Sequence, residues 1–337
     1  MADPAHKENE ERHRDVARAT RREFLVSAAA VAATTAIPSK VFAAPPPLYP
    51  PTDLSYFERP ITPADTALEF GYAAITWQGS DLQAIEEIAA LGFKGIQLRS
   101  PAIGEFHGSP AEVSELLAQH HLKMVALSSG NLSIDHPASD ELALHTAHAE
   151  FVRDAGGLYL QVICERPKGR AATPDDYTRM GRLLTELGKR TADRGIPLAV
   201  HHHMNSLAER PEETERIFAA ADERYVKLLL DVAHWLQGGG DPVKALEQYR
   251  SRLLFLHLKD VVTLEGEEAA AAGRNYRFVE LGRGRVDLPG VFAAIKRIQY
   301  RGWAVVELDA PPDKSHTAKE CGEINKRYLE EKAGYTI

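Results

Sequence analysis

Short apolar runs alternate with amphipathic segments along the chain from Leu68 onward. The runs have the length and β-branched content of buried strands, and the segments between them repeat apolar residues at helical spacing. The eight strand-like runs span residues 69–77, 93–99, 122–130, 158–165, 196–203, 226–234, 252–260 and 302–309. The helix-like segments span residues 81–92, 111–120, 139–155, 175–195, 212–222, 243–250, 288–298 and 317–332. This strict alternation predicts an α/β protein with a (β/α)8 TIM barrel.

A doubly wound parallel sheet is the main alternative for an alternating pattern. In that fold a glycine-rich phosphate-binding turn follows the first strand. Here the first strand-like run ends in Thr76-Trp77-Gln78-Gly79, and no GxGxxG pattern occurs there. We therefore expect one barrel domain that covers residues 64–337.

The residues before the barrel have a different character. Residues 44–63 are proline-rich and lack periodicity, which predicts an extended linker or surface arm. Within residues 1–43, Arg21-Arg22 precedes an alanine-rich run, a pattern that resembles a twin-arginine export signal. The run is too short and too weakly apolar for a spanning helix. We expect export to the periplasm without stable membrane insertion; a tail with a chance arginine pair is the alternative.

Charge and cysteine content narrow the function classes. The net charge of −8 provides no basic surface for nucleic acid or an anionic membrane, and the basic residues are scattered. Small uncharged or hydroxylated substrates are therefore favoured. The two cysteines, Cys164 and Cys321, lie in a strand-like and a helix-like segment, so buried thiols are expected rather than a disulfide framework.

Histidine and carboxylate residues lie at the ends of four successive strand-like runs. These residues are His201 with His203, Asp231, His257 and Glu307. In a parallel barrel the carboxyl ends of the strands meet on one face, where the chemistry takes place. Buried carboxylates are costly unless they are paired or bind a metal. The sequence therefore predicts a metal site formed by His201, Asp231, His257 and Glu307.

Other interpretations of these residues remain open. Asp231 and Glu307 could pair with a barrel arginine such as Arg99, and His257 could be a satisfied core histidine. If the site binds a metal, two imidazoles and two carboxylates suit Mn²⁺, Co²⁺, Zn²⁺, Fe²⁺ or Mg²⁺. Because the set has no thiolate, we favour Mn²⁺.

Further polar residues near strand ends are candidates for substrate contact. His234 is the last residue of the sixth strand-like run, on the turn just after the strand, where it could bind substrate or cap a helix. Lys259 extends the seventh run, where it could steer a substrate oxygen or pair with a carboxylate. Residues that could bind hydroxyl groups, or remain solvated in loops, are Arg99, Glu105, His107, Asn131, Glu165 and Arg283.

Four motifs carry a resemblance to a known group of enzymes. HHHMNS, LDVAH, FLHLKD and the segment FVELGRGRVDLPGVFAAIKRIQYRGWAVVELD resemble the sugar phosphate isomerase/epimerase superfamily of xylose isomerase-like barrels, over residues 68–310. Within it, the HHHM run is similar to that of inosose dehydratases. In the related ketose 3-epimerases, strands five to eight carry Glu, Asp, His and Glu in that order. The last three of these residues match Asp231, His257 and Glu307. His201 stands where those epimerases have the first glutamate, which acts as one of their two bases. The resemblance therefore favours a reaction that needs one base.

This resemblance implies a metal-dependent lyase or dehydratase that acts on a keto-sugar, keto-glycoside or keto-inositol. The enzyme would abstract a proton beside the carbonyl, form an enediolate and eliminate a β-oxygen. Glu307 is the expected base, with His201 or His203 second, and His203, His234 or Lys259 would be the acid. A sugar isomerase or epimerase and a non-catalytic sugar-binding barrel are the alternatives. Export favours 3-keto-glycosides made by a partner sugar 3-dehydrogenase, and a homo-oligomer is compatible with the sequence.

Overall fold

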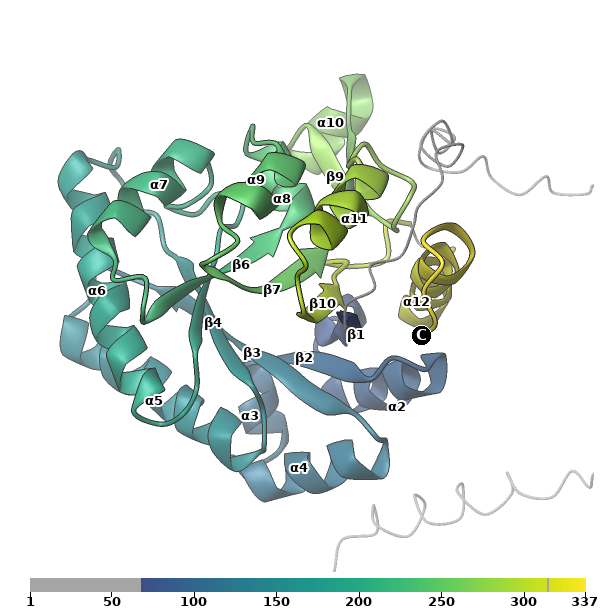
Figure 1. Cartoon of the computed structure of the whole chain (residues 1–337), viewed down its shortest axis with the longest axis horizontal. Helices are drawn as coiled ribbons and strands as arrows, with labels where there is room; N and C mark the ends of the chain where they lie inside the picture. The colour runs from purple at the N-terminus through teal and green to yellow at the C-terminus, as the bar shows by residue number, and fades with distance from the viewer. Residues whose placement is uncertain (1–67, 314) are drawn as a thin grey trace, which may run out of the picture. The chain divides into compact units, whose positions relative to one another are not determined.

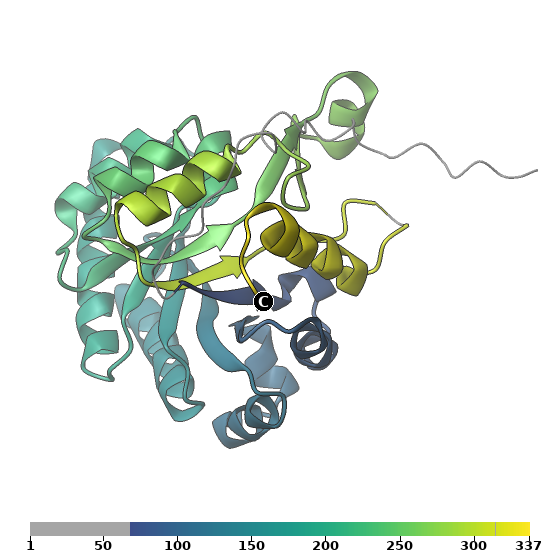
Figure 2. The same cartoon turned by 45° about the vertical axis from the view of Figure 1, so that its right-hand side comes forward.

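The computed structural model describes residues 68–313 and 315–337. Eight parallel strands close into a barrel in the order β1-β10-β7-β6-β5-β4-β3-β2, and helices surround it (Figures 1 and 2). The barrel strands are β1 (Leu68–Ala73), β2 (Gly95–Arg99), β3 (Lys123–Leu132), β4 (Tyr159–Cys164), β5 (Leu198–His201), β6 (Val226–Asp231), β7 (Leu253–Leu258) and β10 (Gly302–Val306). The predicted (β/α)8 barrel is confirmed.

The eight predicted helical segments all form helices, whereas the short helices at 101–105, 232–237 and 266–272 were not predicted. α2 stops at Gly92, which adopts a φ of 99° that favours glycine, and α6 begins with a capping box between Thr173 and Asp176. The α-helices are α2 (Asp81–Leu91), α3 (Pro101–Glu105), α4 (Pro110–Gln119), α5 (Ala138–Asp154), α6 (Pro174–Ala192), α7 (Pro211–Ala220), α8 (Val232–Gln237), α9 (Pro242–Gln248), α10 (Gly266–Ala272), α11 (Leu288–Arg297) and α12 (Ala318–Arg327). The described residues also form a 3-10 turn, η3 (Ala74–Trp77), and a π-helical turn, η4 (Tyr328–Lys332).

Most barrel strands end before the apolar runs that predicted them, although β2 ends with its run and β3 extends two residues beyond it. The run 226–234 divides at Asp231, whose side chain accepts hydrogen bonds from the first amides of α8 and so starts a helix. The run 252–260 divides after Leu258. Its last residue, Asp260, opens a strand β8 (Asp260–Thr263) that pairs antiparallel with β9 (Tyr276–Val279). The sequence analysis did not anticipate this hairpin.

The barrel interior is apolar below the strand ends and polar at them. Ala199, Leu229, Phe255 and Val305 belong to one buried cluster inside the barrel, and the Phe255 ring stacks on Tyr159 at 5.4 Å. Each of the four lies two residues before a histidine or carboxylate at its strand end. Because side chains alternate along a strand, those polar residues also point into the barrel, directly above the apolar layer.

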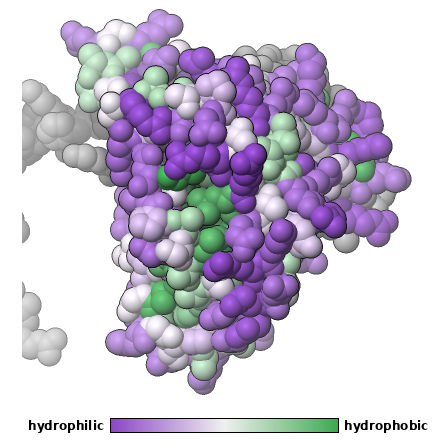
Figure 3. All heavy atoms as spheres, turned by 90° about the vertical axis from the view of Figure 1, so that its left-hand side faces the viewer, coloured by the Kyte–Doolittle hydropathy of each residue, from purple (hydrophilic) through white to green (hydrophobic). Residues whose placement is uncertain are grey.

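A groove with apolar and charged lining residues lies between α5 and α6. Its volume is about 410 Å³, and Ile134, Leu142 and Leu183 contribute apolar surface to it. Figure 3 shows apolar surface on the side of the molecule where these helices lie. Among the described residues, no helix combines the length and apolarity needed to cross a membrane. The expected export signal and linker, residues 1–63, lie outside the described residues.

Candidate metal centre

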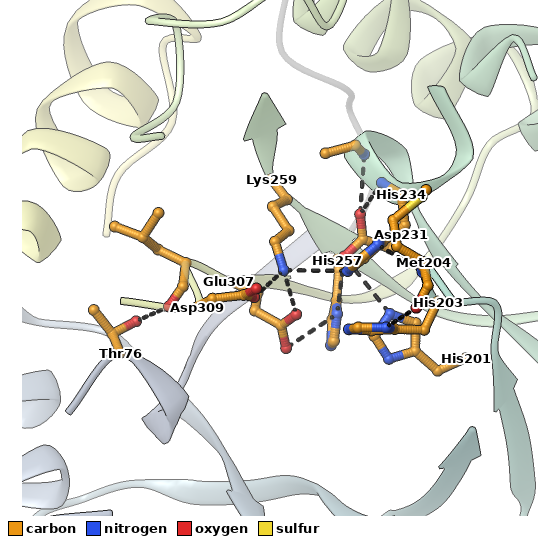
Figure 4. Close-up of polar contacts among 12 residues, drawn as sticks. Thr76, His201, His203, Met204, Asp231, His234, His257, Lys259, Glu307 and Asp309 are labelled. Atoms are coloured by element: carbon orange, nitrogen blue, oxygen red, sulfur yellow. Dashed lines mark hydrogen bonds and ion pairs between the residues drawn. The ribbon is translucent and has the colours of Figure 1, made fainter. Parts of the chain in front are cut away.

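Four side chains from neighbouring strand ends converge at the mouth of the barrel (Figure 4). His201 ends β5, Asp231 ends β6, His257 lies in β7 and Glu307 follows β10. All four are buried, and one donor atom from each lies within 4.8 Å of the others. The structure thus brings together the four residues that the sequence pattern selected as ligands.

The spacing of the donor atoms suits a divalent cation. Nδ1 of His257 lies 3.4 Å from Oδ2 of Asp231 and 3.3 Å from Oε2 of Glu307. Nε2 of His201 lies 3.7 Å from the same Asp231 oxygen. A cation with ligand distances of about 2.0–2.2 Å holds neighbouring donors about 3.0–3.6 Å apart. Since Nε2 of His201, Oδ2 of Asp231 and Nδ1 of His257 have no hydrogen-bond partner within the described part of the chain, these residues fit a bound metal.

The opposite atoms of the same side chains are held by neighbours. Oδ1 of Asp231 accepts hydrogen bonds from the amides of Ala233 and His234. Nε2 of His257 donates to Oε1 of Gln97 at 2.8 Å, which leaves the lone pair of a neutral ring on Nδ1. Sequence reasoning missed Gln97, although it is a polar residue in the otherwise apolar start of β2, GIQL.

The charges of the donor group favour a cation between its four side chains. Burial lowers the pKa of His201 to about 4, so its ring is neutral at pH 7. Burial also opposes protonation of His257, but the carboxylates of Glu307 and Asp231 raise the pKa of His257 to about 9. The two carboxylates therefore attract a cation, either a proton on His257 or a metal ion in its place.

The three consecutive histidines take different roles, as the alternation along β5 predicted. His202 points away from the barrel axis, where its Nε2 accepts from the amide of Asp231 at 3.1 Å and its ring packs on Trp235. His203 lies beside His234, with ring centres 4.0 Å apart. Nδ1 of His203 donates to the carbonyl of Met204 at 2.8 Å, so the neutral ring carries its lone pair on Nε2.

One cavity is lined by His201 and Glu307 of the donor group, and a second cavity shares His203 and Ile163 with it. The smaller, about 50 Å³, is lined by Ala73, Ile75, Gln97, Arg99, Ser128, Gln161, Ile163, His201, His203 and Glu307. The larger, about 500 Å³, is lined by Asn131, Ile163, Cys164, Glu165, Arg166, Lys168, His203, Met204, Asn205 and Ser206. Only the larger has the volume usual for a ligand pocket, so a substrate that reaches the centre would extend into it.

The structure brings some of the predicted substrate contacts to these cavities. Arg99 lines the smaller cavity, where its buried Nε has no hydrogen-bond partner in residues 68–313 and 315–337. No ion pair joins Arg99 to Asp231 or Glu307 among the described residues, which removes the alternative of a barrel-arginine salt bridge. Asn131 and Glu165 line the larger cavity, and Glu165 pairs with Lys168 at 2.8 Å.

Other predicted contacts lie away from both cavities. His107 is 85% exposed and faces Glu112, while the Glu105 side chain accepts from the amide of Leu82 in the α2 region. Arg283 pairs with Glu280 at 3.3 Å. Their expected roles in binding substrate have no support from their positions.

His234 and Lys259 are buried beside the centre and line neither cavity. Lys259 forms ion pairs with Glu307 at 2.9 Å and Asp309 at 2.5 Å. Burial disfavours its charge, but these carboxylates raise the pKa of Lys259 above its usual value. Lys259 is therefore a fixed cation, and of its two expected roles the structure shows the pairing with carboxylates.

Asp260, the last residue of the HLKD motif, organises the loop next to the centre. Its carboxylate accepts from the amides of Gly282, Gly284 and Val286. A side chain at Gly284 would meet Asp260, since an added Cβ would lie 2.1 Å from Oδ1. This motif and the glycines that follow it therefore form one structural unit.

A TIM barrel with a buried His₂-carboxylate₂ group at its carboxyl end is the arrangement of a metal-dependent barrel enzyme. The chain belongs to the xylose isomerase-like TIM barrel family, whose model matches residues 85–326. The superfamily expected from the motifs is thereby confirmed.

Similar proteins include dehydratases. The rhizopine catabolism protein MocC of Rhizobium meliloti is 27% identical over 299 residues, which cover 78% of this chain and 89% of that protein. An inosose dehydratase of Lacticaseibacillus casei is 25% identical over 295 residues, which cover 78% of this chain and 96% of that enzyme. The crystal structure of the IolI protein with a bound zinc atom shares the fold, with a TM-score of 0.65 and 19% identity over 80% of this chain and all of that one.

Proposed function

We propose that the protein is a metal-dependent dehydratase or lyase that removes a β-oxygen substituent from a cyclic polyhydroxy ketone. The observation that carries this proposal is the pairing of two features at one cavity. Four buried donors are spaced for a divalent cation, and His203 faces the same cavity with an imidazole lone pair. The inosose dehydratase relative supports the reaction type.

His201, Asp231, His257 and Glu307 would hold the metal, and Mn²⁺ remains our choice among the divalent ions. A metal here would polarise a carbonyl oxygen and so acidify the adjacent C–H bond. Arg99 and the polar residues of the larger cavity would orient the hydroxyl groups of the substrate.

His203 is better placed than Glu307 to act as the base. Oε1 of Glu307 accepts from Lys259, and Oε2 faces His257 inside the donor group. Contacts with His257 and Lys259 outweigh burial and hold the pKa of Glu307 well below its usual value, which makes it a weak base. His203 keeps an available Nε2 at the boundary of both cavities.

His203 alone can carry out both proton transfers of the elimination. Nε2 of His203 removes the proton beside the ketone, and the electrons of the C–H bond form a C=C bond as the β C–O bond breaks. The imidazolium then returns the proton to the departing oxygen. A keto-inositol would lose water, whereas a 3-keto-glycoside would lose its alcohol.

The test compares two variants that separate metal binding from proton transfer. Mn²⁺-loaded protein is incubated with 2-keto-myo-inositol and with a 3-keto-glucoside in deuterated water, and products are followed by NMR. We expect an enone or a released alcohol with wild type. His203→Asn should keep the metal but lose at least about 100-fold in rate, while Glu307→Gln should bind the metal more weakly. Deuterium incorporation without elimination would instead identify an isomerase or epimerase, and no change in either substrate would contradict the proposal.

We also propose export through the twin-arginine pathway, on the basis of residues 1–43 alone. Export would place the enzyme with substrates made by a periplasmic sugar 3-dehydrogenase. Cell fractionation of wild type and of an Arg21→Lys/Arg22→Lys variant tests this. Processed protein in the periplasm for wild type only is expected, and unprocessed cytoplasmic wild-type protein would overturn it.

A further inference from the structure

Lys259 lies fully buried beside the proposed metal centre, at the centre of a second group of donors (Figure 4). Its Nζ is 2.9 Å from Oε1 of Glu307, 2.5 Å from Oδ1 of Asp309 and 3.4 Å from Nε2 of His234. The face of the Phe278 ring lies 4.1 Å from the same nitrogen. The ammonium is therefore surrounded by two carboxylates, an imidazole and an aromatic face.

The three polar partners of Lys259 are of residue types that bind metals, and two of them are carboxylates. His234, Glu307 and Asp309 each place one donor atom within 4.8 Å of the others. Glu307 belongs to both groups, since Oε2 faces His257 and Oε1 faces Lys259. In two-metal enzymes, two cations about 3.5–4 Å apart act on the same substrate, and a carboxylate with one oxygen toward each position has the geometry to bridge such a pair.

We propose that the Lys259 ammonium occupies a second cation position and thereby keeps the centre mononuclear. The inference rests on the metal centre proposed above. Two neighbouring carboxylates, Glu307 buried and Asp309 about one-third exposed, need a compensating charge, and a cation attached to the backbone supplies it without dissociating. The same contact fixes Glu307 so that Oε2 points to the first position, which makes Lys259 a positioning residue.

The state of His234 indicates which ligands a metal would find without the ammonium. The amide of Met204 donates to Nδ1 of His234 at 3.2 Å, so the neutral ring carries its proton on Nε2, toward Lys259. His234 therefore supplies no lone pair at this position while that bond is kept. Glu307 and Asp309 are the available donors, and two carboxylates favour a hard ion such as Mn²⁺ or Mg²⁺.

The experiment counts metal ions per chain. Wild type, Lys259→Ala, Lys259→Arg and the double variant Lys259→Ala/Asp309→Asn are loaded with Mn²⁺, dialysed and analysed by mass spectrometry for manganese and by EPR. We expect about one ion per chain in wild type, about two in Lys259→Ala, and an EPR signal of two coupled Mn²⁺ ions only in that variant. Lys259→Arg keeps the charge and the double variant loses a ligand, so both should return to about one.

The outcomes separate this inference from the proposed function. A ratio of about one in Lys259→Ala, with about one in wild type, would overturn the second cation position and leave the metal centre intact. A wild type that binds no Mn²⁺ would instead overturn the metal centre itself. If Lys259→Ala does not fold, Lys259→Gln, which is uncharged and of similar reach, serves as the test variant under the same expectations.

Discussion

The hydrogen bond between Gln97 and His257 is expected to control metal affinity. Gln97 is 2% exposed, and its Oε1 accepts from Nε2 of His257 at 2.8 Å. This contact directs Nδ1 toward the donor group and holds the ring in place. Gln97→Leu keeps the approximate volume of the side chain but removes the acceptor, so the buried N–H loses its partner.

The expected size of the effect follows from the loss of one hydrogen bond to His257, a proposed metal ligand. Loss of such a partner weakens metal binding by about 10–100-fold, which is about 1.4–2.7 kcal/mol. The unpaired N–H of His257 should also lower the free energy of unfolding of the metal-free protein by about 1–3 kcal/mol. Competition with a chromophoric chelator measures the first effect, and urea denaturation of metal-free protein measures the second.

Gln161 is the matched control for this experiment. It is also a buried glutamine in a barrel strand, and it lines the same small cavity. Its amide donates to Ser128 and makes no hydrogen bond to the four proposed ligands. Gln161→Leu should therefore leave Mn²⁺ affinity within about twofold of wild type. Equal affinities for Gln97→Leu and wild type would refute the reasoning.

Two further predictions concern stability. Asp81 is 1% exposed, and its carboxylate has no hydrogen-bond partner among the residues that the structure describes. Burial raises the pKa of Asp81 from 3.8 to about 6. The folded state therefore holds the Asp81 proton more tightly than the unfolded state does. As pH rises from about 4 to about 6, the free energy of unfolding of wild type should fall by about 1–3 kcal/mol relative to that of Asp81→Asn. A difference in urea denaturation that does not change with pH would contradict this. Gly284→Ala should lower the free energy of unfolding by about 1–3 kcal/mol, because the added Cβ meets Asp260. Gly104→Ala, where nothing lies within 4 Å, is its control in thermal denaturation, and equal melting temperatures would contradict the clash.

The pattern of apolar runs was sufficient to predict the barrel and the positions of the donor group. Parallel strands place their carboxyl ends on one face, so His201, Asp231, His257 and Glu307 had to meet there once the alternation was recognised. The two-residue period placed these side chains inside the barrel and His202 outside. These features depend only on local periodicity and on the direction of the chain.

The contacts between distant strands could not be predicted in the same way. Gln97 meets His257 across 160 residues of sequence, and Lys259 meets Asp309 across 50. The run 252–260 also concealed the start of the β8–β9 hairpin, because no glycine or proline directly follows Leu258 and the β-branched residues Val261 and Val262 come soon after it. Pairing of this kind depends on the stagger of the strands around the barrel, which the sequence pattern does not express.

The sequence by itself therefore determined the fold class, the strand ends that carry chemistry and the type of donor atoms at those ends. Only the tertiary structure decided which atom of each side chain is available. It assigns one oxygen of Glu307 to Lys259, orients His257 through Gln97 and leaves the lone pair of His203 at the cavity. The physical reason is that a buried polar atom must find a partner, and which partner is within reach depends on the packing of the whole barrel.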